Sequence, residues 1–147
     1  MSATAAVALG SNLGDRAAIL ARARSAIGLL PATRLVVASD VEETAPLGRV
    51  PQGPYLNQML KLETALGPRA LLQGLLAIEA GEGRVRAERW GPRTLDCDLV
   101  LYGHQRVDVP GLTVPHPELP NRDFWQRELR QLGFDPEKAV GSRQIPG

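Results

Sequence analysis

Apolar residues along the chain recur with two different spacings, and the alternation between these spacings predicts the order of the elements. A short apolar run at 4–9 indicates a buried first strand. Residues from about 15 to 29 carry apolar side chains at helical spacing and predict a helix. Apolar and polar residues then alternate at about 35–43 and again at 55–66, which predicts two further strands.

The second half of the chain repeats the order of helix and strand. Pro68 suits the first turn of a helix, which carries several leucines and ends at glycines 81 and 83. A strand with strict alternation follows at 95–101. The order strand, helix, strand, strand, helix, strand predicts an α+β fold of the ferredoxin-like βαββαβ type, with an antiparallel sheet and both helices on one face. The other face is then uncovered and free to carry a site.

The remainder of the chain is irregular, and we expect a short or rebuilt C-terminal extension. Residues 107–109 predict a short strand, and the prolines within 111–117 favour an extended backbone. A helix is expected at 121–132, with its apolar contacts made by Phe124, Leu129 and Leu132. The last residues, 141–147, are expected to be frayed.

The composition is that of one globular domain spanning residues 1–147. A hydrophobic content of 44% argues against disorder, and a net charge of +1 argues against a general nucleic-acid coat. The single cysteine, Cys97, excludes an internal disulfide and fits a reducing cytoplasm, and its apolar neighbours make it a core residue. The chain shows neither a signal peptide nor an apolar run long enough to cross a membrane. We therefore expect a cytoplasmic monomer that binds neither nucleic acid nor membrane.

The clearest chemical signal is the stretch 83–98, where a cationic loop leads into a strand with two aspartates. Four arginines and one tryptophan precede Asp96 and Asp98. The period of two puts both carboxylates on one face, with Cα atoms about 6.5–7 Å apart, and puts Leu101 with the apolar residues of the opposite face. Carboxylate oxygens at this separation suit Mg²⁺, and guanidinium groups suit phosphate oxygens. The stretch therefore predicts a site for a metal-bound nucleotide.

Other interpretations of these polar residues stay open at this point. An Asp-x-Asp pair in a strand is most often a solvated face, and arginines in a loop are usually surface charge. The glycines at 10 and 14 resemble a phosphate-binding loop, but no Gly-Lys-Ser/Thr follows them, so a P-loop is excluded. An RNA-binding module is a further alternative, because ferredoxin-like sheets can present aromatic residues to bases. An aromatic content of only 4% argues against it.

Several segments form a joint pattern that is more specific than any one of them. They are Gly-Ser-Asn-Leu-Gly at 10–14, Thr-Ala-Pro-Leu-Gly at 44–48, Tyr-Leu-Asn at 55–57, the run from Ile-Glu to Asp-Cys-Asp at 78–98, and Thr-Val-Pro-His through Asn-Arg-Asp-Phe at 113–124. In this order they closely resemble the pterin pyrophosphokinases of folate synthesis, over about the first 125 residues. The ferredoxin-like fold of that family agrees with the strand order predicted above.

The resemblance implies a reaction and a set of catalytic residues. The β,γ-pyrophosphoryl group of ATP would move to the hydroxymethyl group of a reduced pterin, 6-hydroxymethyl-7,8-dihydropterin, with release of AMP. Asp96 and Asp98 would hold two Mg²⁺ ions that orient the triphosphate. Arg84 and Arg93 would contact the nucleotide phosphates or the bound pterin. The group that removes the hydroxyl proton is not evident from the pattern, and Asp98 or a metal-bound water is one hypothesis.

The resemblance also implies residues that bind ATP. Glu79 stands where the family places an acid that contacts the nucleotide, and Arg86 and Trp90 stand on a loop that closes over the site in the family. Four further residues would reach the adenosine or the phosphates: Leu99 and Thr113 the adenosine, His116 and Arg122 the phosphates.

A third set of residues would bind the pterin. The side-chain amide of Asn57 would pair with the donor and acceptor edge of the ring, and backbone groups at Thr44 and Leu47 would complete that pairing. Tyr55 and Phe124 would stack on the two faces of the flat ring.

This chain departs from the family pattern at several positions. The stretch between Arg86 and Arg89 is one residue shorter than the commonest form, and Ala45, Leu76 and Gly111 replace a proline, a polar residue and a basic residue. At 125–133 the chain has Trp-Gln-Arg-Glu-Leu-Arg-Gln-Leu-Gly, where members usually carry an apolar run and a proline-containing stretch. A catalytically weakened relative that binds pterin and nucleotide is therefore the alternative function.

Overall fold

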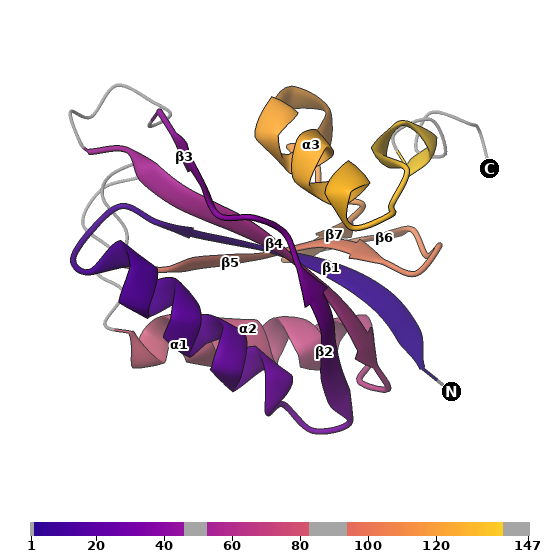
Figure 1. The fold of residues 1–147 in the computed structure, drawn as a ribbon. Helices are drawn as coiled ribbons and strands as arrows, with labels where there is room; N and C mark the ends of the chain where they lie inside the picture. Colours follow the sequence, from indigo (N-terminus) through magenta and orange to yellow (C-terminus); the bar gives the residue numbers. More distant parts are fainter. Residues whose placement is uncertain (1, 46–52, 83–93, 140–147) are drawn as a thin grey trace.

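The structure, a computed structural model, describes residues 2–45, 53–82 and 94–139. Within these ranges the chain forms strands and helices in an order close to the predicted one (Figure 1). In sequence order they are β1 (Ala3–Ser11), α1 (Arg16–Gly28), β2 (Thr33–Ala38), β3 (Glu42–Thr44), β4 (Tyr55–Thr64), α2 (Pro68–Gly81), β5 (Asp96–Tyr102), β6 (Val107–Val109), β7 (Leu112–Val114), the 3₁₀ turn η1 (Leu119–Asn121) and α3 (Asp123–Gln131).

The main sheet confirms the predicted ferredoxin-like arrangement. Its strands lie in the order β2-β4-β1-β5, and every pair within it is antiparallel. The unit β1-α1-β2 has β4 between its two strands, and the unit β4-α2-β5 has β1 between its two strands. This interleaving is characteristic of the ferredoxin-like fold. A separate hairpin of β6 and β7 follows β5 and confirms the short strand predicted at 107–109.

The second predicted strand, at 35–43, is interrupted in the structure. Ala38 faces Leu60 and Glu42 faces Asn57, so this segment carries one more residue than β4 between the two pairs. Ser39 fills the interruption, because its N–H donates to Met59 O and its Oγ accepts from Met59 N, both at 2.9 Å. The inserted residue divides one strand into β2 and β3 and leaves β3 paired only with the start of β4.

The two long helices pack on one face of the sheet, as predicted (Figure 1). The α1 helix begins after Asp15, whose Oδ1 accepts a hydrogen bond from Ala18 N at 3.2 Å, and α2 begins with Pro68. Their inward residues recur at helical spacing and meet the apolar side chains of β1, β4 and β5. The main core includes Leu9, Leu20, Ile27, Leu60, Leu62, Leu71, Leu75 and Cys97.

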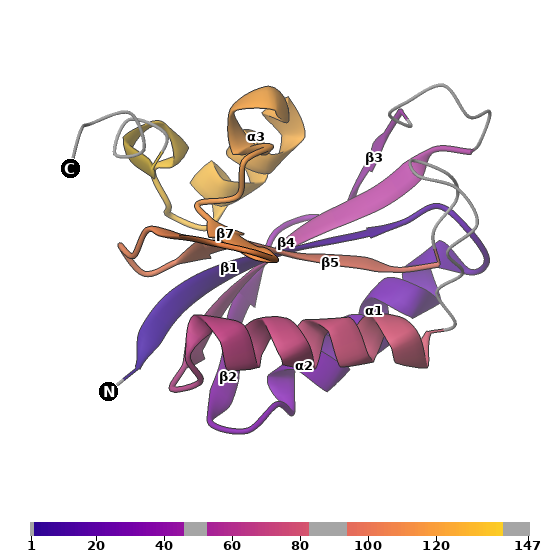
Figure 2. The same cartoon turned by 180° about the vertical axis from the view of Figure 1, so that it is seen from behind.

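The opposite face of the sheet is not uncovered, and that prediction is wrong for part of its area. Figure 2 shows α3 lying across it, on the side away from α1 and α2. Trp125 and Leu129 of α3 are 2% and 0% exposed and pack against Met59 and Val100. The short helix is strongly amphipathic in sequence, so its apolar side needs a partner, and this part of the sheet supplies it.

The prediction for Leu101 is also wrong, and a β-bulge is the cause. The register between β1 and β5 shifts so that Ala6 faces Leu101 whereas Val7 faces Leu99. Val100 is therefore an extra residue in β5. Both it and Leu101 belong to a second apolar core, which lies under α3 and also contains Met59, Trp125 and Leu129. One inserted residue reverses the facing of every residue after it, which strict alternation from Leu95 does not anticipate.

No helix in the described part of the chain is long and apolar enough to cross a membrane.

Candidate active site

The predicted polar residues of two strands, β4 and β5, lie in one row across the sheet, with Gly10 of β1 between them. Gly10 of β1 faces Asn57 on one side and Asp96 on the other, and Ala8 faces Asp98 in the same way. Directly opposed residues of antiparallel strands share a face, so these side chains stand on the face that carries α3. Neighbouring strands lie about 4.8 Å apart, which puts Asp96 and Asn57 about 10 Å apart with Gly10 between them.

A cavity of about 200 Å³ lies over this row. Its floor is the sheet and one of its sides is the start of α3, which is where the second core ends. The residues that line it are Ala8, Leu9, Gly10, Thr44, Ala45, Tyr55, Asn57, Asp96, Asp98, Arg122, Phe124 and Trp125.

The amide of Asn57 is held in a fixed orientation at the floor of this cavity. Asn57 is only 6% exposed, and its Nδ2 donates to Thr44 Oγ1 at 2.5 Å. Gly10 lies directly beside both side chains, because a Cβ there would be in ordinary van der Waals contact, 3.4 Å from Asn57 Oδ1 and 3.5 Å from Tyr55 Cδ1. The floor therefore presents a flat patch of backbone with an oriented amide and an aromatic ring beside it.

The opposite side of the cavity is formed by residues around the start of α3. The Arg122 guanidinium carbon lies 4.4 Å from the centroid of the Trp125 ring, a cation–π contact, and its buried Nε has no hydrogen-bond partner among the described residues. Phe124 and Trp125 meet edge to face, with centroids 6.4 Å apart. The cavity thus has aromatic residues on both sides, Tyr55 from β4 and Phe124 from α3.

A second cavity, of about 320 Å³, lies along the outer edge of β5. It is bounded by α2, β5 and the hairpin strand β7, and it is lined by Leu72, Leu76, Glu79, Asp96, Cys97, Asp98, Leu99, Gly111, Leu112, Thr113, His116 and Pro117. Asp96 and Asp98 line both cavities, because β5 is the edge strand and lies between them. A cation bound by these carboxylates would touch the contents of both.

Glu79 fixes the start of β5 from beneath. Its carboxylate is buried at 4% exposure, and its Oε2 accepts a hydrogen bond from the backbone N–H of Cys97 at 2.7 Å. Cys97 stands between the two aspartates, so the contact holds the backbone that sets their spacing. A charge-assisted bond of this length to a buried donor stabilises the strand end more than an ordinary hydrogen bond does.

His116 approaches the aspartates from the segment after β7. Its Nε2 lies 3.7 Å from Asp98 Oδ1, and its Nδ1 accepts a hydrogen bond from the backbone N–H of Glu118 at 3.1 Å. Since Nδ1 is the acceptor, the ring proton is carried by Nε2, on the side of Asp98. The ring is held by an edge-to-face contact with Trp125, with centroids 5.0 Å apart.

Among the described residues, no group of three or more His, Cys, Asp and Glu side chains is arranged to hold a metal ion. Asp96 and Asp98 offer a pair of carboxylates on a cavity wall instead. This donor set fits Mg²⁺, which commonly takes one or two carboxylates and completes its shell with water and substrate phosphate oxygens.

The structure brings together the predicted residues that it describes. Asp96, Asp98, Tyr55, Asn57, Thr44, Phe124 and Arg122 share the first cavity, and Glu79, Leu99, Thr113 and His116 share the second with the two aspartates. The other predicted site residues, Leu47, Arg84, Arg86, Trp90 and Arg93, lie outside the described residues.

The sequence interpretation missed five residues that line the first cavity: Ala8, Leu9, Gly10, Ala45 and Trp125. Gly10 was interpreted only by comparison with a phosphate-binding loop and as part of the family pattern, yet it forms the floor. Its even spacing from Ala6 and Ala8 on a strand could have placed it on the face of small residues. Trp125 was noted only as a departure from the family pattern, and nothing in the local sequence indicates that it supports His116, Arg122 and Phe124.

Comparison with known proteins identifies the family of this chain. Residues 6–133 match the family model of 7,8-dihydro-6-hydroxymethylpterin-pyrophosphokinase. The chain is 46% identical over 132 residues to the 2-amino-4-hydroxy-6-hydroxymethyldihydropteridine pyrophosphokinase of Haemophilus influenzae, covering 90% of this chain and 82% of that protein. It is 45% identical to the protein of that name from Pseudomonas aeruginosa over 140 residues, covering 95% and 86%, and 35% identical to that of Bacillus subtilis over 144 residues, covering 98% and 86%. The chain therefore belongs to the 7,8-dihydro-6-hydroxymethylpterin-pyrophosphokinase family.

Proposed function

We propose that this chain transfers pyrophosphate from ATP to the hydroxymethyl group of 6-hydroxymethyl-7,8-dihydropterin, releasing AMP, as a step of folate biosynthesis. The family and the names of the relatives support this activity. The observation that carries it in the structure is the position of Asp96 and Asp98, which line two separate cavities. A transfer between two substrates needs such a shared boundary, since the reacting groups must meet there.

The pterin occupies the first cavity in this proposal. The oriented amide of Asn57 pairs with the polar edge of the ring, and Thr44 keeps that amide in place through the 2.5 Å hydrogen bond. Tyr55 and Phe124 line the cavity from different elements and offer aromatic surfaces to the two faces of the ring. The hydroxymethyl group would then point along the row toward Asp96.

The nucleotide occupies the second cavity. Leu99 and Thr113 line it and would contact the adenosine, and Glu79 would contact the nucleotide while it supports β5. His116 presents its Nε2 proton beside Asp98, where a phosphate oxygen can accept it. Arg122 lines the first cavity together with Asp98 and carries a guanidinium that suits phosphate.

Asp96 and Asp98 would hold two Mg²⁺ ions together with the triphosphate. Bound there, the metal supplies charge neutralisation for the phosphate oxygens as the bond to AMP breaks. The residues of the chain bind and orient the two substrates in line and exclude water from the transferred group. We keep Asp98 as the hypothesis for the group that accepts the hydroxyl proton. The roles of Arg84, Arg86, Trp90, Arg93 and Leu47 stay predictions, as do a monomeric state and a cytoplasmic location.

The binding-only alternative is not favoured by any feature of the described site. Both carboxylates, the amide and the two aromatic rings of the predicted set line the cavities, although the segment after Phe124 departs from the family pattern. The departing segment begins at Trp125, which lines the first cavity, and its apolar residues belong to the second core.

The decisive experiment is an assay of AMP release with labelled ATP, the reduced pterin and Mg²⁺. The wild type should turn over, and Asp96→Asn and Asp98→Asn should each lose about 100-fold or more of kcat, because each removes a charge that holds the metal. Asp135→Asn is the matched control, since Asp135 is exposed and lines neither cavity. Binding of both substrates by the wild type without AMP release would overturn the enzyme proposal in favour of the binding-only relative.

A further inference from the structure

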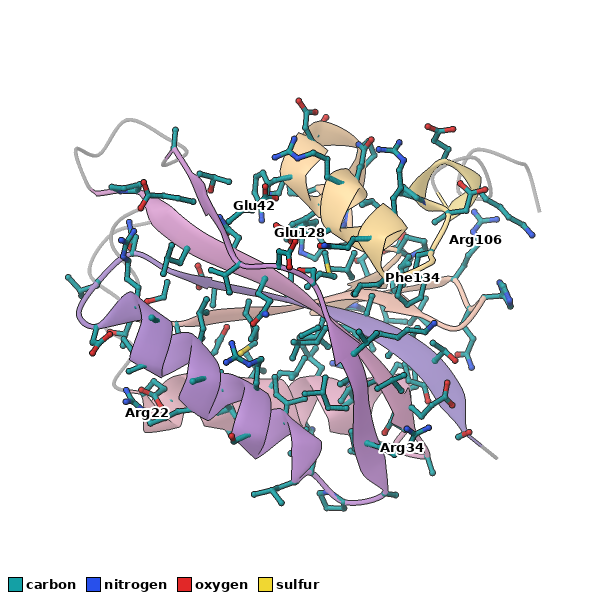
Figure 3. All side chains as sticks on the ribbon, in the orientation of Figure 1. Arg22, Arg34, Glu42, Arg106, Glu128 and Phe134 are labelled. Atoms are coloured by element: carbon teal, nitrogen blue, oxygen red, sulfur yellow. The ribbon has the colours of Figure 1, made fainter. Side chains whose placement is uncertain are left out.

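Two glutamates from different elements meet on the face of the sheet covered by α3. Glu42 belongs to β3 and Glu128 to α3, and Figure 3 shows their labelled side chains close together between these elements. Glu128 is only 3% exposed. Both of its carboxyl oxygens and Glu42 Oε1 are buried, and none accepts a hydrogen bond from an N–H or hydroxyl group of the described residues. Three buried acceptors without donors would be costly if both groups were ionised.

The charged groups around this pair neutralise only part of it. Arg127 of α3 binds the other oxygen of Glu42, with Nη2 and Oε2 3.2 Å apart, and its side chain is largely exposed. Asp40, before β3, is bonded to Gln131, and from β4 the residue opposite Glu42 is the uncharged Asn57. Arg122, before α3, stacks on Trp125. Within the described ranges, no cation is paired with Glu128.

A proton shared between Glu42 and Glu128 would remove most of this cost. A protonated Glu128 can donate its O–H to Glu42, which satisfies a buried oxygen on each side and removes one of two like charges. Burial is the largest effect and, with the hydrogen bond to Glu42 and its charge, raises the pKa of Glu128 to about 9. Arg127 has the opposite, smaller effect. At neutral pH the pair therefore holds one proton.

The elements joined by this proton are the ones that enclose the first cavity. Thr44 lies two residues after Glu42 on β3, and its hydroxyl accepts the hydrogen bond that orients the Asn57 amide. One turn before Glu128 on α3 stand Phe124 and Trp125, which line the cavity from its other side. The contact between α3 and the β3 segment, called the seam below, is also stabilised by Gln131, which forms two hydrogen bonds with Asp40, of 3.0 and 2.8 Å.

We propose that Glu42 and Glu128 share one proton and act as positioning residues, holding α3 against β3 and so fixing the width of the pterin cavity between Thr44 and Phe124. The inference rests on the proposed function of that cavity. When the proton is lost, two buried carboxylates repel each other across the seam, and α3 separates from β3. The protein then binds the pterin weakly, whereas the nucleotide cavity on the far side of β5 keeps the walls that α2, β5 and β7 form.

The test compares the wild type with Glu128→Gln between about pH 7.5 and pH 10. Glutamine has nearly the shape of a protonated glutamate and keeps a donor toward Glu42 at every pH. At about pH 7.5 the two proteins should have the same KM for the pterin within about twofold. One pH unit above the pKa only about a tenth of the wild type is protonated, so its KM should exceed that of the variant about tenfold, with the KM for ATP unchanged. The pterin's own ionisation is the same in both assays and cancels in this ratio.

Glu137→Gln is the matched control, because Glu137 is exposed and its only described partner is Arg130. Its KM should follow that of the wild type at every pH. Infrared difference spectra at neutral pH should show the C=O stretch of a protonated carboxyl in the wild type and in Glu137→Gln but not in Glu128→Gln. A constant KM ratio across the pH range, or the absence of that band from the wild type, would overturn the proposal. If no protein turned over, the proposed function would fail, and the infrared band would still decide whether the proton is shared.

Discussion

Replacing Glu128 by glutamine should stabilise the folded protein at neutral pH, although the glutamate is buried and close to another carboxyl. The pKa of Glu128 is raised from 4.5 to about 9 by burial and by Glu42. Between these two values the folded protein holds one proton more than the unfolded chain. The contribution of this group to stability is therefore fully present below about pH 4.5 and is lost as the pH rises toward the folded pKa.

The size of the effect follows from the same two values. Each pH unit in this window lowers the free energy of unfolding by about 1.4 kcal/mol, because one proton is released on unfolding. From 4.5 to about pH 7 the wild type loses about 3 kcal/mol, which is a large fraction of the stability of a typical domain. Glutamine has no proton to lose and keeps this free energy, while its amide still donates toward Glu42.

The measurement is urea unfolding of the wild type and of Glu128→Gln at a series of pH values between about 5 and 8. The variant's advantage in unfolding free energy should grow by about 1.4 kcal/mol per pH unit and be smallest at the acid end. Glu137→Gln, an exposed carboxyl on the segment after α3, should show no comparable growth. A difference between wild type and Glu128→Gln that stays constant with pH would refute the reasoning, since it would mean that Glu128 is ionised in both states.

Three further substitutions test how the site is built. Gly10→Ala should raise the KM for the pterin about tenfold and leave the KM for ATP unchanged in steady-state assays, because the added methyl group occupies the cavity floor without displacing Asn57 or Tyr55; an unchanged pterin KM would place the ring elsewhere. Glu79→Ala should cost about 1–3 kcal/mol in urea unfolding, since the buried N–H of Cys97 loses its acceptor, and should weaken Mg-ATP more than the pterin in calorimetric titrations; equal weakening of both would contradict a role specific to the start of β5. Leu129→Ala should cost about 2–5 kcal/mol, because the side chain is fully buried beneath α3, and a loss below about 1 kcal/mol would mean that the second core is not closely packed.

Much of the fold could be predicted because the main elements carry strong local signals. Asp15 caps α1, Pro68 opens α2, and the inward residues of both helices recur at helical spacing. Gln58 is an exception in β4, because alternation puts it on the core face with Leu56, Leu60 and Leu62, and the structure explains it. Gln58 is buried and bonds to Arg24 and to the backbone oxygen of Ser39, so its polar groups are satisfied.

The errors arose where one strand carries a residue more than its neighbour. The interruption at Ser39 and the bulge at Val100 depend on the register between strands that are distant in sequence. The amino-acid sequence alone does not show the register between strands. The predicted alternation was therefore continued through Ser39 and through Val100. The cover provided by α3 was missed for a related reason, because an amphipathic helix shows that it needs a partner but not which surface it meets.

The candidate site was predicted unevenly. The alternation around Asp96 and Asp98 indicated a shared face, and the resemblance to a family indicated Asn57, Tyr55 and Phe124. Which residues stand next to one another across the sheet follows only from the pairing of β5, β1 and β4. The contact between Glu42 and Glu128 has no local signal at all, because each glutamate alone is typical of a solvated position.

The edge position of β5 has a consequence for the order in which substrates bind and products are released. Because β5 lies between the two cavities, the proposed function lets each substrate exchange with solvent through its own cavity without passing through the other. AMP would lie entirely in the second cavity, whereas the pyrophosphorylated pterin would extend from the first cavity past Asp96 and Asp98 into the second. In the proposed function AMP can therefore leave the outer cavity while the pyrophosphorylated pterin is still bound, and the release of the two products should be kinetically separable.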